Sequence, residues 1–136
     1  TLEYRMHQHC DNAIKVAKYL LDHPKIDNTI YPGLSNHPQF NLATKQMTKG
    51  GSVVTFTIKN DNAFNFINGL KLFDISNNLG DTKSLVTHPA STTHRVIGEK
   101  GRKKLKITNN MVRLSIGLED VEDLIKDIDH SLKLVQ

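Results

Sequence analysis

The chain has 136 residues, 38% of them hydrophobic and 24% charged, a length and composition that suit one packed domain of ordinary size. The net charge is +4, and no stretch approaches the roughly 20 apolar residues of a membrane-spanning helix or forms an apolar signal core at the start. Because Cys10 is the single cysteine, an internal disulfide is excluded, and we expect a single cytoplasmic domain with no membrane partner.

The N-terminal third is predicted to form two helices of unequal length. Apolar side chains recur every three or four residues over residues 1–21, which is the pattern of one long amphipathic helix, and Pro24 stops it. Its expected apolar stripe is Leu2, Met6, Cys10, Ala13, Ala17, Leu20 and Leu21. After a turn signal at Tyr31–Leu34, we expect a short helix from Phe40 to Met47, closed by Gly50 and Gly51.

The middle of the chain is predicted to alternate between strands and a helix. Residues 52–58 alternate apolar and polar side chains, the period of a strand. Asn60 or Asp61 can cap the next helix. The side chains expected to face inward from that helix are Phe64, Ile67 and Leu70.

The C-terminal half is predicted to complete a sheet. Strands are expected at residues 72–75, 84–87 and 111–116, followed by a helix over Glu119–Leu134 with acidic residues in its first turn and lysines later, which suits the helix dipole. The buried stripe expected for this helix is Val121, Leu124, Ile125, Ile128 and Leu132. The element order predicts an α/β (α+β-like) domain: an open, largely antiparallel sheet of about four strands with helices packed on one side.

Arg113 is the most informative single residue, because it lies inside the apolar run Met111–Ile116. A guanidinium set among apolar side chains costs desolvation unless an anion meets it, and a planar carboxylate is its best partner. Arg113 is therefore a candidate anion anchor. The alternation of the run also allows a simpler interpretation, in which Arg113 and Ser115 share the wet face of a half-exposed strand.

Two other kinds of site receive little support. Positive charges cluster at Lys100, Arg102, Lys103, Lys104 and Lys106, and such a cluster can contact phosphates. With 6% aromatic residues and no nucleic-acid motif, however, the cluster is better interpreted as a solvated surface turn, and we expect no nucleic-acid partner. The seven histidines complete no metal-ligand set, so no metal site is predicted.

Six segments together resemble one enzyme family. They are TLEYRM at 1–6, YPGL with SNHP at 31–38, GGSVVTF at 50–56, LGDTKSL at 79–85, HPASTTH at 88–94 and MVRLSIGLEDVEDL at 111–124. The chain resembles the pyridoxal-phosphate (PLP) enzymes of cysteine and methionine metabolism, which include cystathionine synthases and lyases and the homoserine-ester sulfhydrylases. Within that family it is most similar to the O-succinylhomoserine sulfhydrylases and next to the O-acetylhomoserine sulfhydrylases.

The resemblance implies roles for four residues. Arg113 matches the arginine that holds the α-carboxylate of the amino-acid substrate, and Asn78 matches a position beside that carboxylate, with a plain turn residue as the alternative. Ser84 and Thr93 lie in matching motifs and are candidates to line the same pocket, with local capping of backbone groups as an equal alternative. His88 and His94 are expected to be structural, satisfying backbone acceptors.

The resemblance also implies what the chain lacks. In the family, PLP is held by a large domain upstream of the TLEYRM-like helix, which supplies the Schiff-base lysine, the partner of the pyridine nitrogen and the phosphate cradle. We therefore expect residues 1–136 to be the C-terminal small domain alone, a fragment or split-gene product with no catalytic residue, inactive by itself and not binding PLP. The expected partners are the missing large domain and, as in the family, a homotetramer.

Completed by that domain, the implied chemistry is γ-replacement: sulfide displaces the ester group of an activated homoserine and gives homocysteine. The alternatives are a fragment of an O-acetylhomoserine sulfhydrylase or of a cystathionine synthase or lyase. A different alternative is a non-catalytic binding or assembly module. For either kind of small domain, we expect the apolar stripe of the first helix to be left exposed where a large domain would cover it.

Overall fold

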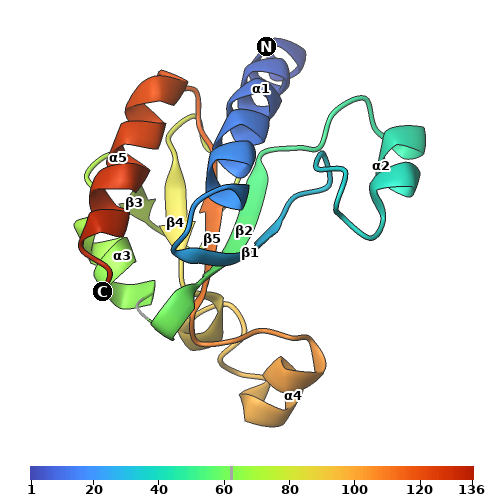
Figure 1. Ribbon diagram of the computed structural model, residues 1–136. Helices are drawn as coiled ribbons and strands as arrows, with labels where there is room; N and C mark the ends of the chain where they lie inside the picture. Colours follow the sequence, from blue (N-terminus) through green and yellow to red (C-terminus); the bar gives the residue numbers. More distant parts are fainter. Residues whose placement is uncertain (62) are drawn as a thin grey trace.

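The computed structural model describes residues 1–61 and 63–136. In chain order the elements are α1 (Leu2–Leu21), β1 (Ile26–Ile30), α2 (Phe40–Gln46), β2 (Val53–Ile58), the short 3-10 helix η1 (Lys59–Asp61), α3 (Ala63–Gly69), β3 (Asp74–Ile75), β4 (Leu85–Thr87), the 3-10 helix η2 (Pro89–Ser91), α4 (Gly98–Lys104), β5 (Met111–Ser115) and α5 (Val121–Lys133). Figure 1 shows them as a sheet with α1 and α5 lying across one face.

The described strands form one five-stranded sheet in the order β1-β2-β5-β4-β3. All neighbours are antiparallel except β3 and β4, which run parallel. The predicted open, largely antiparallel sheet with helices on one side is confirmed. The sequence pattern did not predict β1, because Asp27 and Asn28 interrupt its apolar positions, and a register irregularity between Ile26 and Asn28 breaks the alternation.

The core lies between this sheet and the helices. Alternate side chains of the central strands point into it, among them Val54 and Phe56 of β2 and Val112 and Leu114 of β5, all fully buried. The register pairs Val54 with Leu114 and Thr55 with Arg113. Thr55 and Arg113 therefore share the opposite face of the sheet, called here the outer face.

Helix α1 covers the core with its apolar side chains, contrary to one expectation from the sequence. The side chains of Ala13, Val16, Ala17 and Leu20 are fully buried, and α1 contacts β1, β2 and α5. The prediction that its apolar stripe would be left exposed was wrong, because the sheet of this domain and α5 already cover it. Of the predicted stripe, Leu2 and Leu21 are the exposed members.

Of the side chains predicted to face inward from α3, Ile67 is buried and Leu70 packs against the core, but Phe64 does not face inward. Phe64 is 56% exposed, whereas Phe66 is fully buried and meets Phe56 edge-on, with ring centroids 5.3 Å apart. The helix begins at Ala63, so Ala63, Phe66 and Ile67 form its inward face at spacings of three and four. Asn60, a predicted cap, adopts a positive φ of 65° before the helix; the side chain of Asp61 lies outside the described part of the structure.

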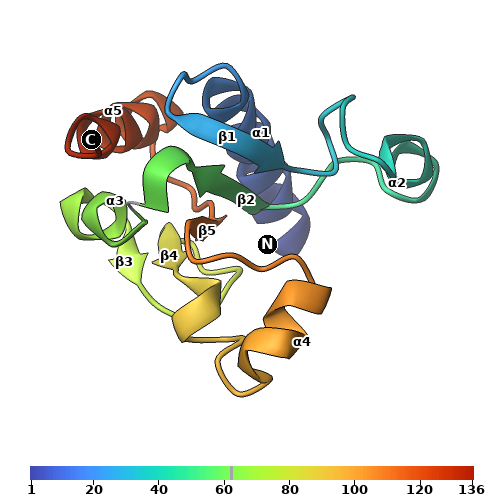
Figure 2. The ribbon, with the colours of Figure 1, turned by 60° about the horizontal axis from the view of Figure 1, so that its bottom comes forward.

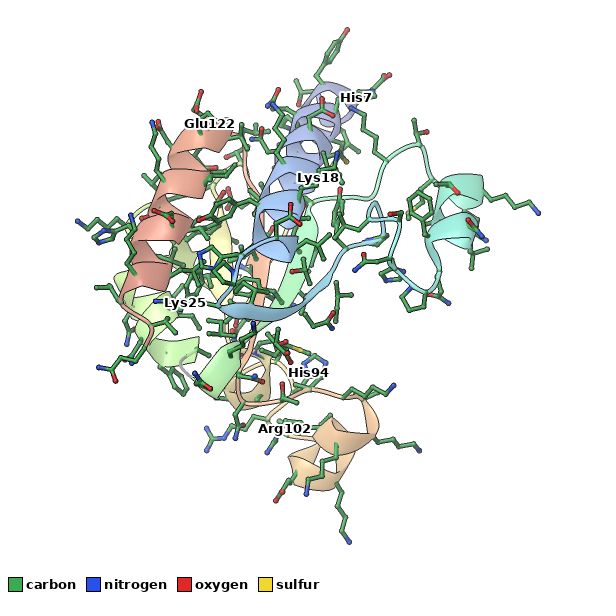
Figure 3. All side chains as sticks on the ribbon, viewed as in Figure 1. His7, Lys18, Lys25, His94, Arg102 and Glu122 are labelled. Atoms are coloured by element: carbon green, nitrogen blue, oxygen red, sulfur yellow. The ribbon has the colours of Figure 1, made fainter. Side chains whose placement is uncertain are left out.

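Helix α5 begins later than predicted because Glu119 does not join it. Asp120 is the cap, and its Oδ1 accepts from the backbone N–H groups of Glu122, at 2.9 Å, and Asp123, at 3.3 Å. At the other end, Lys25 donates to the carbonyls of Leu132, at 2.9 Å, and Val135, at 2.5 Å. Figure 3 shows Lys25 beside this end of α5. Both ends are therefore capped, as helix termini require.

The basic segment is a helix and not the turn that was predicted. Helix α4 projects from the body of the domain, as Figure 2 shows, and none of its side chains is buried. Arg102 links this helix to the preceding segment, because its Nη1 donates to the carbonyls of His94 and Arg95, both at 3.3 Å. The lysines of this segment keep their charges in solvent, in agreement with the predicted solvated surface.

Candidate functional site

Arg113 lies at the centre of the outer face of the sheet. Its register partners are Thr55 on β2 and Thr87 on β4, so two short polar side chains flank it. Arg113 is half-buried as a residue, and its Nη2 donates to the carbonyl of Asn77 at 2.9 Å in an exposed position. Burial lowers the pKa of Arg113 from its ordinary value, although a guanidinium remains charged at neutral pH.

Arg113 is a cation without a matching anion. Within residues 1–61 and 63–136, no carboxylate forms an ion pair with it. A guanidinium has five N–H donors, and the Asn77 carbonyl takes one of them. The remaining donors and the uncompensated charge fit a planar anion such as a carboxylate.

Residues 77–84 form a loop that is held against β4 and β5. The amide Oδ1 of Asn77 accepts from Thr87 at 3.0 Å, and the backbone N–H of Gly80 donates to Ser115 Oγ at 2.9 Å. Gly80 has a φ of 82°, a conformation that glycine adopts without strain. Leu118 N–H donates to the Thr82 carbonyl at 2.7 Å. The loop therefore lies over Arg113 in a fixed position.

Asn78 lies at the exposed tip of this loop. It directly follows Asn77, which contacts Arg113, and its backbone N–H donates to Ser76 Oγ at 3.2 Å. Its side chain is exposed and belongs to the same loop as the carbonyl that Arg113 contacts. The structure thus brings the Asn78 region and Arg113 together.

Ser84 is fully buried. Its Oγ donates to Glu119 Oε2 at 2.8 Å and accepts from Gly117 N–H at 2.8 Å, while its own N–H donates to Glu119 Oε1 at 2.7 Å. Of the two roles predicted for Ser84, these contacts support the local one, because its hydroxyl is committed within the chain.

Thr93 lies in the segment that follows η2. It is exposed, and its hydroxyl is hydrogen-bonded to His94 Nδ1 at 2.7 Å. The preceding Thr92 connects this segment to the site, because its hydroxyl lies 2.9 Å from Thr87 Oγ1 and donates to the His88 carbonyl at 2.7 Å. The segment therefore reaches the neighbourhood of Arg113 through the two threonines, with Thr93 one residue further on.

His88 is structural, as predicted. It is buried, its Nε2 lies 2.6 Å from the carbonyl of Asn109, and its Nδ1 lies 2.7 Å from Ser91 Oγ. His94 bonds instead to the hydroxyl of Thr93. Figure 3 shows His94 close to Arg102, in agreement with the bond from Arg102 to its carbonyl.

Three residues that the sequence did not single out contribute to the site. Asn77 supplies the carbonyl that meets Arg113, and Thr87 is the cross-strand partner that holds Asn77. Glu119 was assigned to a helix and instead binds Ser84. The register between β4 and β5 identifies Thr87, and the hydrogen bond from Arg113 identifies Asn77; both are properties of the folded domain.

Arg113 lines neither of two grooves on the described surface, although Thr82 and Lys83 of the 77–84 loop line the second. A groove of about 330 Å³ lies between α1 and the α2 segment, lined by side chains that include Ile14, Tyr31 and Met47. A second of about 340 Å³ lies beside Lys71 and Glu119. The described residues contain no group of three His, Cys, Asp or Glu side chains placed to hold a metal ion. None of the helices in the described part is long and apolar enough to cross a membrane.

Comparison with known proteins identifies the family. Residues 1–133 match the family model described as Cys/Met metabolism PLP-dependent enzyme. The chain is 46% identical over 138 residues to O-succinylhomoserine sulfhydrylase of Mycobacterium tuberculosis (strain ATCC 25618 / H37Rv), which covers 97% of this chain and 34% of that protein.

Two solved structures are similar in fold as well as in sequence. One, from Campylobacter jejuni, is described as an O-acetylhomoserine (thiol)-lyase and carries a pyridoxyl-lysine; it matches with a TM-score of 0.93 and 38% identity over 96% of this chain and 32% of its own. The other is cystathionine gamma-lyase from Lactobacillus plantarum complexed with L-serine, with a TM-score of 0.95 and 32% identity over 98% of this chain and 35% of its own. The chain thus spans about a third of the length of the relatives it matches. It belongs to the family of PLP-dependent enzymes of Cys/Met metabolism.

Proposed function

We propose that residues 1–136 are the small, C-terminal domain of a PLP-dependent O-succinylhomoserine sulfhydrylase, and that this domain binds the α-carboxylate of the amino-acid substrate. The complete enzyme would replace the succinyl ester of homoserine by sulfide and form homocysteine. The single observation that carries the proposal is the half-buried Arg113, which has no carboxylate partner in the described part of the chain. The 46% identity to a sulfhydrylase supports the choice of reaction.

The proposed work of this domain is to orient the substrate. Arg113 would take the α-carboxylate through two parallel N–H donors, and the amide of Asn78 would donate a further hydrogen bond from the loop tip. Thr93 is proposed to line the same space from the neighbouring segment. Fixing the carboxylate sets the direction in which the reacting carbons of the substrate point, which is a large part of what an enzyme contributes to rate.

The residues around Arg113 do not fit PLP itself. The cofactor supplies an electron sink and needs a lysine for its Schiff base. Lys83, the lysine of the 77–84 loop, has its ammonium in an ion pair with Asp74 at 2.7 Å, and the contacts of Arg113 are with a backbone carbonyl and flanking threonines. We propose that the cofactor is held by the part of the enzyme that corresponds to the remaining length of the relatives, in a homotetramer, and that this chain alone is inactive.

A binding titration tests the proposal. The ¹⁵N-labelled chain is titrated with O-succinyl-L-homoserine while the Arg113 Nε–H and Asn78 signals are followed. Both signals should move together, and Arg113→Ala should weaken binding by about 10- to 100-fold, since a hydrogen bond to a charged group contributes about 1.5–3 kcal/mol. Arg102→Ala is the matched control, because Arg102 contacts only backbone carbonyls, and it should leave the affinity unchanged.

The ligand also has a matched control. O-acetyl-L-homoserine has no carboxylate besides the α-carboxylate and should bind, whereas its α-carboxamide, which has no carboxylate at all, should not bind. Equal binding of the amide, or unchanged affinity in Arg113→Ala, would refute a carboxylate site at Arg113. Replacing the ester by O-acetyl-L-homoserine in an assay of the full-length enzyme separates the proposed sulfhydrylase from its acetyl-specific relatives.

The cofactor part of the proposal has its own test. The isolated chain is mixed with PLP and reduced with borohydride, and the labelled lysines are mapped by mass spectrometry. We expect only scattered, substoichiometric label on surface lysines. One stoichiometric adduct at a single lysine would show that this chain binds the cofactor by itself.

A further inference from the structure

Glu119 makes contacts that its position in the chain does not require. It stands just before α5, whose capping is done by Asp120. The carboxylate of Glu119 instead turns to the 77–84 loop, where Oε1 accepts from Ser84 N–H at 2.7 Å and Oε2 from Ser84 Oγ–H at 2.8 Å. Hydrogen bonds to a carboxylate are stronger than those between neutral groups. Glu119 is therefore the strongest link between the turn before α5 and the loop that carries Asn78.

The 77–84 loop is anchored at both ends and exposed between them. Its base is fixed by Ser84 and by the bond from Leu118 N–H to the Thr82 carbonyl. Its other end meets the sheet through Asn77, which contacts Arg113 and Thr87. Residues 78–83 between these anchors are exposed, and a further bond, from Gly80 N–H to Ser115 Oγ at 2.9 Å, holds the middle of the loop. The anchors on both sides of Asn78 therefore decide where its amide lies relative to the guanidinium.

The turn that carries Glu119 is itself held from the core side. Asn12 of α1 donates to the carbonyls of Gly117, at 3.0 Å, and Glu119, at 2.9 Å, and His9 Nδ1 lies 2.6 Å from the Ile116 carbonyl. A Cβ at Gly117 would lie 2.4 Å from both Glu119 Oε2 and the Thr82 carbonyl. The backbone thus approaches the loop so closely that only glycine fits at this position.

We propose that Glu119 is a positioning residue for the carboxylate site: through Ser84 it fixes the 77–84 loop so that the Asn78 amide and the Arg113 guanidinium meet on one anion. The inference rests on the proposed function and adds a residue that touches no substrate. Its physical basis is preorganisation, because a donor that is held in place before binding loses less freedom when the ligand arrives.

The test compares Glu119→Gln with Asp127→Asn in the same ¹⁵N titration with O-succinyl-L-homoserine. Glutamine keeps an oxygen for Ser84 N–H, but its NH₂ group is a donor and cannot accept the Ser84 Oγ–H, so that bond is lost. We expect about a tenfold weaker affinity. Asp127 is a matched control, since its buried carboxylate also accepts backbone N–H groups, those of Lys71 and Leu72. Its substitution should lower the Tm by a similar amount and leave the affinity unchanged.

An epistasis measurement separates positioning from general loss of structure. If Glu119 acts through Asn78, its effect on affinity should depend on Asn78. Glu119→Gln, which weakens ligand affinity about tenfold in the parent chain, should then weaken it less than about twofold in a chain that already carries Asn78→Ala. An equal loss of affinity in Glu119→Gln and Asp127→Asn, or a tenfold loss that persists without Asn78, would overturn the proposal.

Two further variants keep the outcomes decisive. Should Glu119→Gln fail to fold, Ser84→Ala removes one oxygen from the same link and is expected to weaken binding by about three- to tenfold; unchanged affinity there counts against the inference. A normal response of Arg113→Ala together with no response of Glu119→Gln rejects the positioning role alone. No response of Arg113→Ala rejects the proposed function itself.

Discussion

The two faces of the central sheet differ sharply although the same strands form both. On the core face, Val112 and Leu114 of β5 are fully buried, in one cluster with side chains of α1 and α5. On the outer face, Arg113 lies between them in sequence and meets threonines and a loop carbonyl. One face therefore stabilises the domain by burial, and the other carries polar side chains around a half-buried arginine.

The difference shows why residues of this chain complete the core, while Arg113 is left without an anionic partner among the described residues. Each fully buried Leu or Phe contributes about 1.5–3 kcal/mol, and the core face gathers such side chains from strands and helices of this chain. The outer face keeps a half-buried cation whose desolvation is not offset by a carboxylate of the described residues. A site that is to bind an anion must leave that cation open, at some cost in stability.

Leu114→Ala should have the largest effect of these variants. It should lower the stability that the core face provides and leave ligand binding on the outer face unchanged. Removing a fully buried leucine leaves a cavity, so we expect the free energy of unfolding to fall by about 2–5 kcal/mol. Urea unfolding followed by circular dichroism measures this. Among variants that still fold, ligand affinity should stay within about twofold of the parent, and a large loss of affinity would show that the two faces are not independent.

Arg113→Met should have the opposite pair of effects, on ligand binding and not on stability. It removes the partly desolvated charge and keeps an apolar stem, so carboxylate binding is lost while the free energy of unfolding stays within about 0.5 kcal/mol of the parent or rises. The same urea titration measures it. A fall of about 2 kcal/mol or more would mean that Arg113 is mainly a structural residue, through its bond to Asn77.

Thr29→Val should have a smaller effect, again on the core side. The hydroxyl of Thr29 is buried and, among the described residues, lacks a hydrogen-bond partner. Valine has nearly the same shape and no polar atom, so the free energy of unfolding should stay equal or rise by up to about 1 kcal/mol. Thr44→Val is a fitting contrast, because that hydroxyl is exposed and bonds to the Phe40 carbonyl. A destabilised Thr29→Val would reveal a partner for the hydroxyl, such as a bound water.

The smallest effect concerns pH. Burial lowers the pKa of His23 from its ordinary 6.5, and its Nδ1 accepts from Lys25 N–H, which protonation would prevent. The unfolded chain thus binds a proton more readily, so the free energy of unfolding should decline as the pH falls below about 6.5. His23→Gln should flatten that decline between pH 7 and 5. Asp129, whose pKa is lowered by its bonds to Lys133 and Tyr19, contributes stability that is present above about pH 3.8 and is lost as the pH falls below it.

Local patterns predicted most of the elements because they depend on neighbouring residues. The alternation of 52–58 and 111–116 and the helical spacing of the first and last helices are confirmed within a few residues. Strand β1 and helix α4 were missed, since both are rich in polar residues and form through contacts made elsewhere: β1 pairs with β2, and Arg102 ties α4 to His94 and Arg95. The choice between Phe64 and Phe66 depended on where α3 begins.

The sequence by itself determined the class of fold, the family and the identity of Arg113 as the residue to examine, because apolar periodicity and residue motifs are written along the chain. Only the tertiary structure decided what surrounds Arg113. The register of β5 with its neighbours brings Thr55 and Thr87 beside it, and the 77–84 loop brings Asn77 onto it. These contacts join residues far apart in sequence, and such pairings are fixed when the sheet forms and not by any local pattern.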